Sequence, residues 1–396
     1  PGPRHPPPVE WSTVPYILWV GLVPQDELPP LGLGHRRFPV PRVAPGQGHR
    51  TSTPQKQGFP PPPGNLETGG KRREKISGVH KQIASAESLI LPHPLRKGQS
   101  RSVEPIRYFN RQSGTLETEK IYGERWLRLA YENPAGSILR HLIKRPFFSR
   151  WYGHRMARPS SRKLIAPFVR DFGLDPSEFA ENPETFQSFN EFFIRRLKPE
   201  ARPLDPDPDT LLFPCDGRHL GFPDVSSIEG VFVKGQRFTL TALLQSAELA
   251  RQFERGTLVL SRLCPIDYHR YHFPAAGTPS PSRLVNGPLF SVSPLALRRN
   301  LSFLWENKRV ITALETSRFG TILTVEIGAT NVGSINQTFV PDQPVARGDE
   351  RGYFAFGGSS TITLFEPDRV TLADDLLEHS ANQVELYAPM GSYLGK

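Results

Sequence analysis

Cysteines are scarce in this chain of 396 residues, and so are long apolar runs. Two cysteines, Cys215 and Cys264, cannot form a framework of disulfide bonds, so we expect a reducing interior. The early apolar run at residues 14–23 contains Pro15 and is far shorter than the roughly 20 residues that span a bilayer. No basic cluster precedes this run and no small-residue cleavage site follows it, as a secretory signal would require. The sequence therefore predicts neither a disulfide-stapled protein nor a membrane-spanning one.

Proline is abundant by contrast, and it is concentrated at the front of the chain. Of the 42 prolines, 17 fall within residues 1–64, where no apolar periodicity is sustained. Such a composition favours disordered or extended polyproline chain over a packed core. We therefore predict a disordered, proline-rich leader over residues 1–100.

The net charge of +10 is unevenly distributed along the chain. Residues 1–170 hold 28 Lys and Arg against 11 Asp and Glu, whereas residues 171–396 hold 21 against 28. A basic front half next to an acidic body predicts contact with a polyanion, either nucleic acid or an anionic membrane surface. No zinc-finger, helix-turn-helix or RNA-recognition signature accompanies the charge, so we favour the membrane and expect no nucleic-acid partner.

Apolar side chains recur at helical spacing within residues 122–172, with arginines and large aromatics between them. Ile138, Leu139 and Leu142 share one face of such a helix. A basic helix with an apolar face is typical of a segment that lies in a membrane interface. A helical hairpin packed on the body would have the same pattern. Both interpretations stay open for a basic, amphipathic helical region that we place over residues 101–203.

The pattern changes to short, β-rich segments separated by turns beyond Pro203. We expect an α+β fold in which residues 204–396 form a β-rich, mostly antiparallel catalytic body. One more short helix is expected just before this body, over residues 188–197, ended by Pro199. The clearest strand candidates are residues 230–233, 257–260, 321–327 and 360–365.

The sequence GGSST at residues 357–361 interrupts a run that otherwise predicts a strand. Glycine destabilises a strand interior, so a glycine pair there indicates a turn, a bulge or a close approach of the backbone. A hairpin turn is the simplest interpretation. The alternative is chemical, because a serine that follows an unhindered glycine carbonyl can attack that carbonyl and cleave its own chain.

Two other segments carry residues suited to proton transfer. Asp216 begins an Asp-Gly turn, and His269 and His272 lie three residues apart in the sequence DYHRYHFP. A zinc site would need more ligands than Asp267 and Cys264, which are the only candidates nearby, so we expect no metal. A neutral imidazole can accept and return a proton near pH 7, which favours acid–base work for the histidine pair.

Together the chain offers the three groups that activate a hydroxyl. An acid such as Asp216 orients an imidazole, and the imidazole of His272 or His269 accepts the proton of a serine such as Ser359. The G-x-S-x-G elbow of many hydrolases is missing. Here the glycines directly precede the serine, so their own carbonyl is the nearest electrophile.

The motifs of the second half of the chain resemble those of the phosphatidylserine decarboxylases, which are pyruvoyl-dependent, self-cleaving lyases. The resemblance extends from about Ser188 to the C-terminus, in separate blocks whose order and joint presence are specific. The first hundred residues carry none of these blocks. The blocks are FFIR (192–195), ARP (201–203), PCDG (214–217), DYHRYHFP (267–274), NKRV (307–310), GATNVGSI (328–335), GDERGYF (348–354) and GSSTI (358–362).

The resemblance implies that the proenzyme cuts itself between Gly358 and Ser359. His272, oriented by Asp216, would remove the hydroxyl proton of Ser359, whose oxygen would attack the Gly358 carbonyl. Elimination and hydrolysis would then give a β-chain of residues 1–358 and a small α-chain that starts with a pyruvoyl group made from Ser359. Ser360 stands where the family commonly has threonine and is the alternative nucleophile, but alignment through residues 364–365 favours Ser359.

The resemblance also implies the second half of the chemistry. The pyruvoyl ketone would form a Schiff base with the amine of phosphatidylserine and accept electrons as CO₂ leaves, which yields phosphatidylethanolamine. His269 would return a proton to the α-carbon, and Asp267 would support the turn that carries the histidines.

We therefore expect a decarboxylase that associates peripherally with an anionic phospholipid surface. The membrane would be the cell membrane of a bacterium, or the mitochondrial inner membrane or an endomembrane of a eukaryote. Two alternatives stay open: the same pyruvoyl chemistry on another serine lipid or a soluble amino acid, and a non-catalytic basic adaptor for membranes or nucleic acid. Whether the protein forms a homodimer is also left open by the sequence.

Overall fold

The part of the chain that is described begins after the proline-rich front. The computed structural model describes residues 105–120, 127, 146–226, 228, 238–297, 300–329, 334–356 and 359–396. All of these belong to one unit, Lys71–Lys396. The predicted leader, the strand expected at 230–233 and most of the apolar helical pattern of residues 122–145 lie outside the described residues.

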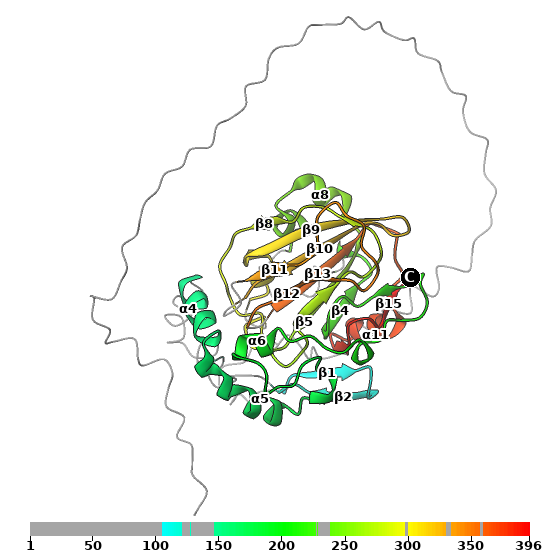
Figure 1. Ribbon diagram of the computed structural model, residues 1–396. Helices are drawn as coiled ribbons and strands as arrows, with labels where there is room; N and C mark the ends of the chain where they lie inside the picture. Colours follow the sequence, from blue (N-terminus) through cyan, green and yellow to red (C-terminus); the bar gives the residue numbers. More distant parts are fainter. Residues whose placement is uncertain are drawn as a thin grey trace, which may run out of the picture. The chain divides into compact units, whose positions relative to one another are not determined.

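A ten-stranded sheet forms the frame of the described unit (Figure 1). Among the described strands of this sheet, only β1 and β14 pair in parallel, so the mostly antiparallel body that we predicted is confirmed. The strands follow one another in the order β2 (Thr115–Thr118), β1 (Arg107–Asn110), β14 (Glu385–Ala388), β4 (Gly217–Phe222), β5 (Thr257–Leu263), β13 (Ser359–Phe365), β10 (Gly320–Ile327), β9 (Arg309–Thr316) and β7 (Thr278–Pro279), with β8 (Arg283–Val285) also paired to β9.

The central strands β5, β13 and β10 are rich in β-branched and large apolar residues. Their sequences are TLVLSRL, SSTITLF and GTILTVEI, and every residue of β13 is buried. Residues of this kind suit a strand that is covered on both faces. The strands predicted at 257–260, 321–327 and 360–365 are all confirmed.

The described residues also form two smaller sheets. The first joins β11 (Ile335–Gln337), β12 (Glu350–Phe354) and β6 (Arg270–His272). It therefore pairs the histidine segment with the strand that leads toward the glycine pair. The second joins β15 (Tyr393–Gly395) to β3 (Leu211–Leu212).

Short helices connect and cover these sheets. The helices are α4 (Pro146–Met156), α5 (Ile165–Phe172), α6 (Phe189–Phe193), α7 (Leu240–Leu244), α8 (Ala247–Gln252), α9 (Pro294–Leu297), α10 (Phe303–Glu306) and α11 (Asp374–Ala381), with 3₁₀ turns at Pro159–Leu164, Pro176–Glu178 and Pro199–Ala201.

The helix expected over residues 188–197 is confirmed as α6 but is shorter than predicted. It begins after Ser188, whose hydroxyl accepts a hydrogen bond from the backbone N–H of Glu191 at 3.2 Å. It ends early because the chain beyond it pairs elsewhere: Ala180 N donates to Arg196 O at 3.0 Å and Lys198 N donates to Glu178 O at 2.8 Å. The distant segment thus captures backbone groups that a longer helix would have used.

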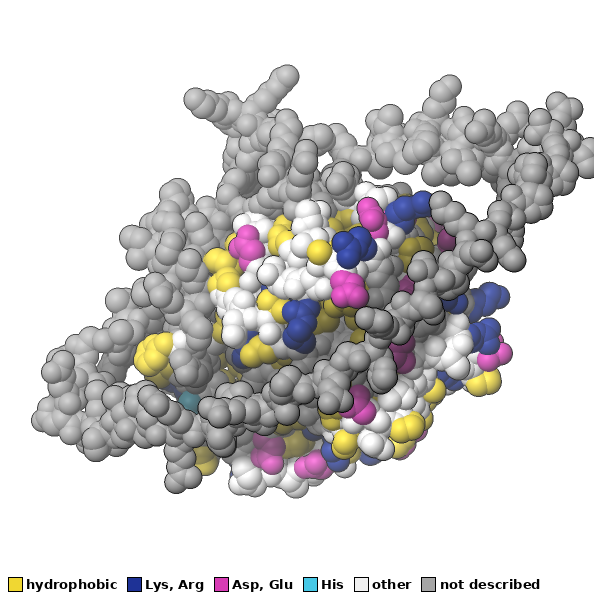
Figure 2. Space-filling model, turned by 90° about the horizontal axis from the view of Figure 1, so that it is seen from above, with side chains coloured by type: hydrophobic (Ala, Val, Ile, Leu, Met, Phe, Trp, Pro, Cys, Tyr) yellow, Lys and Arg dark blue, Asp and Glu magenta, His cyan; other side chains and the backbone are white. Residues whose placement is uncertain are grey.

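The surface carries both signs of charge. On the face that Figure 2 shows, Lys and Arg side chains are interspersed with Asp and Glu side chains among the described residues. Hydrophobic side chains lie between them in small groups.

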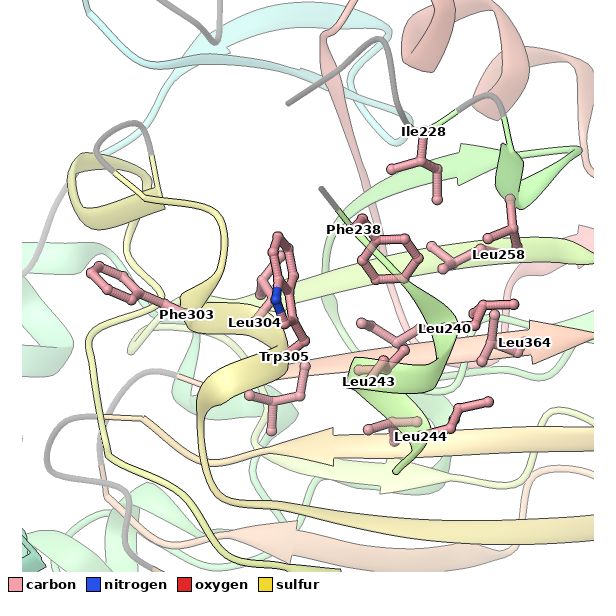
Figure 3. Packing of buried hydrophobic residues seen from close by; sticks show 14 of the residues in the cluster. Ile228, Phe238, Leu240, Leu243, Leu244, Leu258, Phe303, Leu304, Trp305 and Leu364 are labelled. Atoms are coloured by element: carbon pink, nitrogen blue, oxygen red, sulfur yellow. The ribbon is translucent and has the colours of Figure 1, made fainter. Parts of the chain in front are cut away.

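The main apolar core lies between the central strands and the helices α7 and α10 (Figure 3). Figure 3 shows Trp305 of α10 beside Phe238, and their rings meet edge to face with centroids 5.5 Å apart. A second cluster, which includes Leu376 of α11 and Leu394 of β15, covers the other face of the sheet. Because both faces are covered, polar side chains on the central strands must find partners inside the protein.

Candidate active site

Ser359 is the first residue of β13, at the end of a central strand of the large sheet. Its backbone pairs with Leu263 of β5, and its side chain is fully buried. Its hydroxyl has no hydrogen-bond partner among the described residues. Gly358, the predicted electrophile, lies outside the described residues together with Gly357. A buried hydroxyl without a partner costs stability, which makes this one a candidate for chemistry.

Strand geometry separates Ser359 from its neighbour Ser360. Successive side chains of a strand point to opposite faces. Ser360 shares its face with Ile362 and Leu364, which belong to the apolar core under α7 and α10. Its hydroxyl is buried and also lacks a partner among the described residues. Ser359 shares the opposite face with Thr361, and the choice of Ser359 over Ser360 stays a prediction.

The face of Ser359 carries residues that are sequence neighbours of the predicted acid and of one predicted histidine. Thr361 Oγ1 lies 3.9 Å from the sulfur of Cys215, the residue before Asp216. Cys215 packs in one cluster with Leu263, Tyr271 and Phe354. Tyr271 directly precedes His272. The cluster therefore joins the segments of Asp216, the histidine pair and the strand that leads to the glycines.

Asp216 is buried and is held by an arginine that the sequence reasoning did not assign. Arg202 donates to it from two nitrogens, with Nε 2.9 Å from Oδ1 and Nη2 2.6 Å from Oδ2. The backbone N–H of Met390 donates to Oδ1 at 2.8 Å. Three donors fix the carboxylate, and such charge-assisted bonds are short and strong.

His272 is buried and its ring is neutral near pH 7. Burial lowers the pKa of His272 to about 4, against the opposing influence of the carboxylates of Glu350 and Asp216. Its ring stacks on Tyr268 with centroids 5.7 Å apart. Its Nδ1 has no hydrogen-bond partner among the described residues. A buried neutral imidazole with an available nitrogen is suited to accept a proton.

Asp216 and His272 lie in neighbouring segments. The backbone N–H of His272 donates to Pro214 O at 2.7 Å, which places the two segments side by side. No hydrogen bond joins the Asp216 carboxylate to the His272 ring in the described part of the chain. The carboxylate is bonded to Arg202 instead, and the orientation of His272 by Asp216 that the resemblance implies stays a prediction.

His269 is fully buried, and its tautomer follows from its contacts. Its Nδ1 lies 2.9 Å from the carbonyl oxygen of Asp267. A carbonyl only accepts, so Nδ1 carries the proton and Nε2 is left as the basic nitrogen. The ring lies 4.0 Å from the ring of Phe193 in α6, measured between centroids. The carbonyl of His269 also accepts the backbone N–H of Phe354 at 3.0 Å.

Asp267 holds the loop that carries His269. Its Oδ2 accepts the backbone N–H of Cys264 at 2.6 Å and a hydrogen bond from Nη1 of Arg218. The supporting role that we expected for Asp267 agrees with these contacts. Among the described residues no group of three or more His, Cys, Asp or Glu side chains could hold a metal ion.

Three residues near the site escaped the sequence reasoning, namely Arg202, Tyr268 and Glu350. Each lies inside a motif block that was recognised, yet none was given a role. Glu350 pairs across the sheet with His272 and accepts hydrogen bonds from Arg270 at 2.8 and 2.9 Å. Its place in the block GDERGYF, shortly before the glycine pair, was the available signal for Glu350. The contact of Arg202 with Asp216 spans 14 residues and has no such signal.

The comparisons with known proteins identify the family. The family model described as phosphatidylserine decarboxylase matches residues 189–388, half of the chain. This chain belongs to the phosphatidylserine decarboxylase family.

Curated relatives are similar over most of their length. A phosphatidylserine decarboxylase proenzyme of Fusobacterium nucleatum is 41% identical over 293 residues, which cover 74% of this chain and 98% of the relative. The proenzyme of the same name from Desulfitobacterium hafniense is 42% identical over 291 residues, 73% of this chain and 98% of the relative. That of Chlamydia muridarum is 43% identical over 290 residues, 73% of this chain and 96% of the relative.

Proposed function

We propose that this chain is the precursor of a phosphatidylserine decarboxylase, which cleaves itself before Ser359 and then converts phosphatidylserine to phosphatidylethanolamine. The observation that carries the proposal is the buried hydroxyl of Ser359, which directly follows two glycines and has no hydrogen-bond partner among the described residues. The names of the relatives agree with both steps.

Self-cleavage begins with a proton transfer. His272 is neutral near pH 7 because burial lowers its pKa to about 4, so it can take the proton of Ser359. The freed oxygen attacks the carbonyl carbon of Gly358, and an ester replaces the peptide bond. Loss of the ester oxygen from Cβ of residue 359 leaves the Gly358 carboxylate on the β-chain. Hydrolysis of the new N-terminus releases ammonia and leaves a pyruvoyl group.

Asp216 assists through its charge. Its carboxylate is fixed by Arg202 and by the N–H of Met390, and it acts on His272 across space. An imidazolium that forms when His272 takes the proton is stabilised by a nearby fixed anion. Arg202 positions that anion.

The residues at the start of β13 fit a pyruvoyl group, because the group is made from Ser359 itself and that hydroxyl makes no competing bond to any described residue. When present, the pyruvoyl ketone supplies an electron sink for the loss of CO₂. His269 has its Nδ1 proton held by the Asp267 carbonyl, so Nε2 is the nitrogen that would first take up a proton and then pass it to the substrate carbon. The buried setting of both histidines excludes water from that transfer.

We propose that the enzyme acts at a membrane surface. Among the described residues no helix is long and apolar enough to cross a membrane. On α4, Phe147 and Trp151 lie one turn apart and are 75% and 44% exposed, with His154 and Arg155 in the last turn. Exposed aromatics beside basic residues suit the interface of an anionic bilayer, where the protein would bind peripherally. A homodimer stays a prediction.

Replacing the two exposed aromatics tests the membrane surface. The variant Phe147→Ser with Trp151→Ser should bind vesicles containing phosphatidylserine at least about tenfold more weakly than the wild type. The reason is that two aromatic rings that would insert into the bilayer interface are lost. Co-sedimentation with vesicles measures this. Leu284→Ser is the control, since Leu284 is 51% exposed on β8. Equal binding by the aromatic and control variants would contradict the proposed surface.

The activity itself is tested by release of labelled CO₂. The full chain should decarboxylate carboxyl-labelled phosphatidylserine in vesicles, and Ser359→Ala should not. Free labelled serine and a second serine lipid are offered in parallel. Release from free serine alone would support the soluble amino acid alternative, and release from none of the three would support a non-catalytic adaptor. His269→Ala should still cleave itself but fail to release CO₂.

A further inference from the structure

The short segment before the glycine pair is held by three different parts of the protein. Phe354 N donates to His269 O at 3.0 Å, and Ala355 N donates to Ser334 O at 3.3 Å. Phe356 N donates to the side-chain oxygen of Asn190 in α6 at 3.0 Å. Three successive backbone N–H groups are therefore fixed, the last of them by a side chain. A backbone N–H only donates, so the atom of Asn190 that faces it is the amide oxygen.

The side chain of Phe356 is fixed as well. It is 3% exposed, and it packs into the phenylalanine-rich cluster formed by α4, α5 and α6. Its ring meets Phe189 edge to face at 5.1 Å and Phe193 at 4.8 Å, and lies 5.6 Å from Tyr152, all between centroids. Edge-to-face contacts restrict the orientation of a ring as well as its depth.

The other end of the glycine pair is equally constrained. Ser359 begins β13, which is paired on one side with β5 and on the other with β10. Only Gly357 and Gly358 separate it from Phe356, and three Cα–Cα steps span at most about 11 Å. Any shift of Phe356 must therefore be absorbed by two residues, one of which carries the proposed electrophile.

Asn190 is well placed to fix the position of Phe356 because the N-terminus of its helix, α6, is capped by hydrogen bonds. Ser188 caps α6 by accepting the N–H of Glu191, and the Glu191 carboxylate accepts the N–H of Gln187 at 2.5 Å. The carbonyl of Asn190 accepts the N–H of Ile194 at 3.1 Å within the helix. The amide of Asn190 thus projects from a fixed backbone onto the scissile segment.

We propose that Asn190 and the ring of Phe356 anchor the scissile segment, and that Asn190 is a positioning residue for self-cleavage. This rests on the proposed function. The anchor holds the Gly358 carbonyl where the Ser359 hydroxyl can reach it, and reactions of this kind lose about 100-fold in rate from misplacement of about 1 Å. Once the chain is cut the task of Asn190 is complete, so its loss slows the formation of the active enzyme and leaves the finished enzyme unchanged.

Phe193 differs from Asn190 in this respect. Its ring touches both Phe356, at 4.8 Å, and His269, at 4.0 Å. It therefore supports the scissile segment before the cut and the histidine after it. A change at Phe193 affects both steps, whereas a change at Asn190 affects the first alone.

The test follows self-cleavage of the full chain in time. The chain is made by cell-free translation with a radioactive pulse, and the conversion of precursor to two chains is read from gels. Asn190→Leu keeps the size of the side chain and removes the acceptor, and it should cleave at least about tenfold more slowly. Asn190→Asp keeps an acceptor oxygen and should cleave within about threefold of the wild type.

Asn182→Leu is the matched control, because the Asn182 side chain also accepts one backbone N–H, that of Glu184 at 2.9 Å. It should cleave at the wild-type rate. Each variant is also made with Ser359→Ala, and the melting temperature of these uncut chains separates slow cleavage from loss of folding. The rate of CO₂ release per cut molecule should be unchanged in Asn190→Leu.

Wild-type cleavage by Asn190→Leu would overturn the proposal, as would a lowered rate of CO₂ release per cut molecule. If Asn190→Leu does not fold, Phe356→Leu decides: slow cleavage with normal melting supports the anchor, and normal cleavage overturns it. A wild-type chain that never cleaves would instead remove the proposed function, so the two failures are distinguishable.

Discussion

At the scale of single residues, the charges around His272 govern when its ring can accept a proton. Burial is the largest influence on its pKa, which lies at about 4, and Arg270 and Arg351 lower it while Glu350 and Asp216 raise it. Arg270 and Glu350 also bond to each other. The imidazole is therefore a base whose strength depends on a balance between neighbouring charges rather than on one partner.

This balance predicts the pH dependence of self-cleavage. The rate should follow the neutral fraction of His272, so it should be level from about pH 6 to 8 and fall only as the pH approaches about 4. Arg270→Gln removes a charge that lowers the pKa and frees Glu350, so its midpoint should move up; Glu350→Gln should move it down. Timed cleavage in buffers across this range measures the midpoints. A wild-type midpoint near the ordinary 6.5 would contradict the role of a buried neutral histidine.

At the scale of elements, the hairpin of β1 and β2 contributes a charge to the interior of the large sheet. Glu119 follows β2 and accepts hydrogen bonds from Nη1 and Nη2 of Arg262 at 3.0 and 2.6 Å. Arg218 lies 3.8 Å from it, and Glu385 also accepts from Arg262. Burial raises the pKa of Glu119, but the two arginines outweigh burial and hold that pKa at about 2. The hairpin thus neutralises arginines of β4 and β5.

Removing this charge should destabilise the fold. Glu119→Gln leaves Arg262 and Arg218 buried with less compensation, and breaking such a pair costs about 3–5 kcal/mol. Denaturant unfolding of the uncut Ser359→Ala chain measures the change in the free energy of unfolding. Asp171→Asn is the control, because the ion pair of Asp171 with Arg170 is exposed and such pairs contribute about 0–1 kcal/mol. Equal, small losses in both variants would contradict the structural role of Glu119.

The central elements could be predicted from the sequence, and the edge hairpin could not. Strands β5, β10 and β13 are runs of β-branched and apolar residues that a covered strand requires. Strand β2 is mostly exposed and polar, β1 is only four residues long and partly buried, and β1 is held by pairing with β14 from the far end of the chain. The local residue pattern of β1 does not reveal a strand partner that lies so far away in the sequence.

The same division holds in the candidate site. Ser359, the histidine pair and Asp216 could be chosen as candidate site residues, because their residue types suit proton transfer and nucleophilic attack and because they lie in recognised motif blocks. The bond from Arg202 to Asp216 and that from Asn190 to Phe356 could not, because each joins segments brought together only by the fold. Side chains that position others leave little trace in sequence spacing.

At the scale of the whole molecule, two buried neutral histidines make the fold sensitive to acid. Burial lowers the pKa of His219 to about 3 and that of His272 to about 4. The unfolded chain binds protons at these histidines near the ordinary value of 6.5, whereas the folded chain does not. The stability that these two histidines contribute is therefore fully present above about pH 6.5 and is lost as the pH falls from 6.5 toward about 4 for His272 and about 3 for His219.

His219 offers a direct check of this sensitivity. Its Nδ1 lies 2.8 Å from the Ser261 hydroxyl and its Nε2 lies 3.2 Å from Ala388 O, contacts that a glutamine amide can make without titrating. His219→Gln in the uncut Ser359→Ala chain should lose less free energy of unfolding between pH 7 and pH 5 than its parent. Denaturant titrations at the two pH values measure this. A loss as large as the parent's would show that His219 does not contribute.

The central claim is that this chain cuts itself between Gly358 and Ser359 and converts the serine to a pyruvoyl group. Intact mass spectrometry of the purified full-length protein tests it most directly. We predict two chains, one ending at Gly358 and a smaller one comprising residues 359–396 that carries a pyruvoyl mass at its start and resists N-terminal sequencing. Ser359→Ala should give one uncut chain. A single uncut chain from the wild type, or a cut at another residue, would contradict the account.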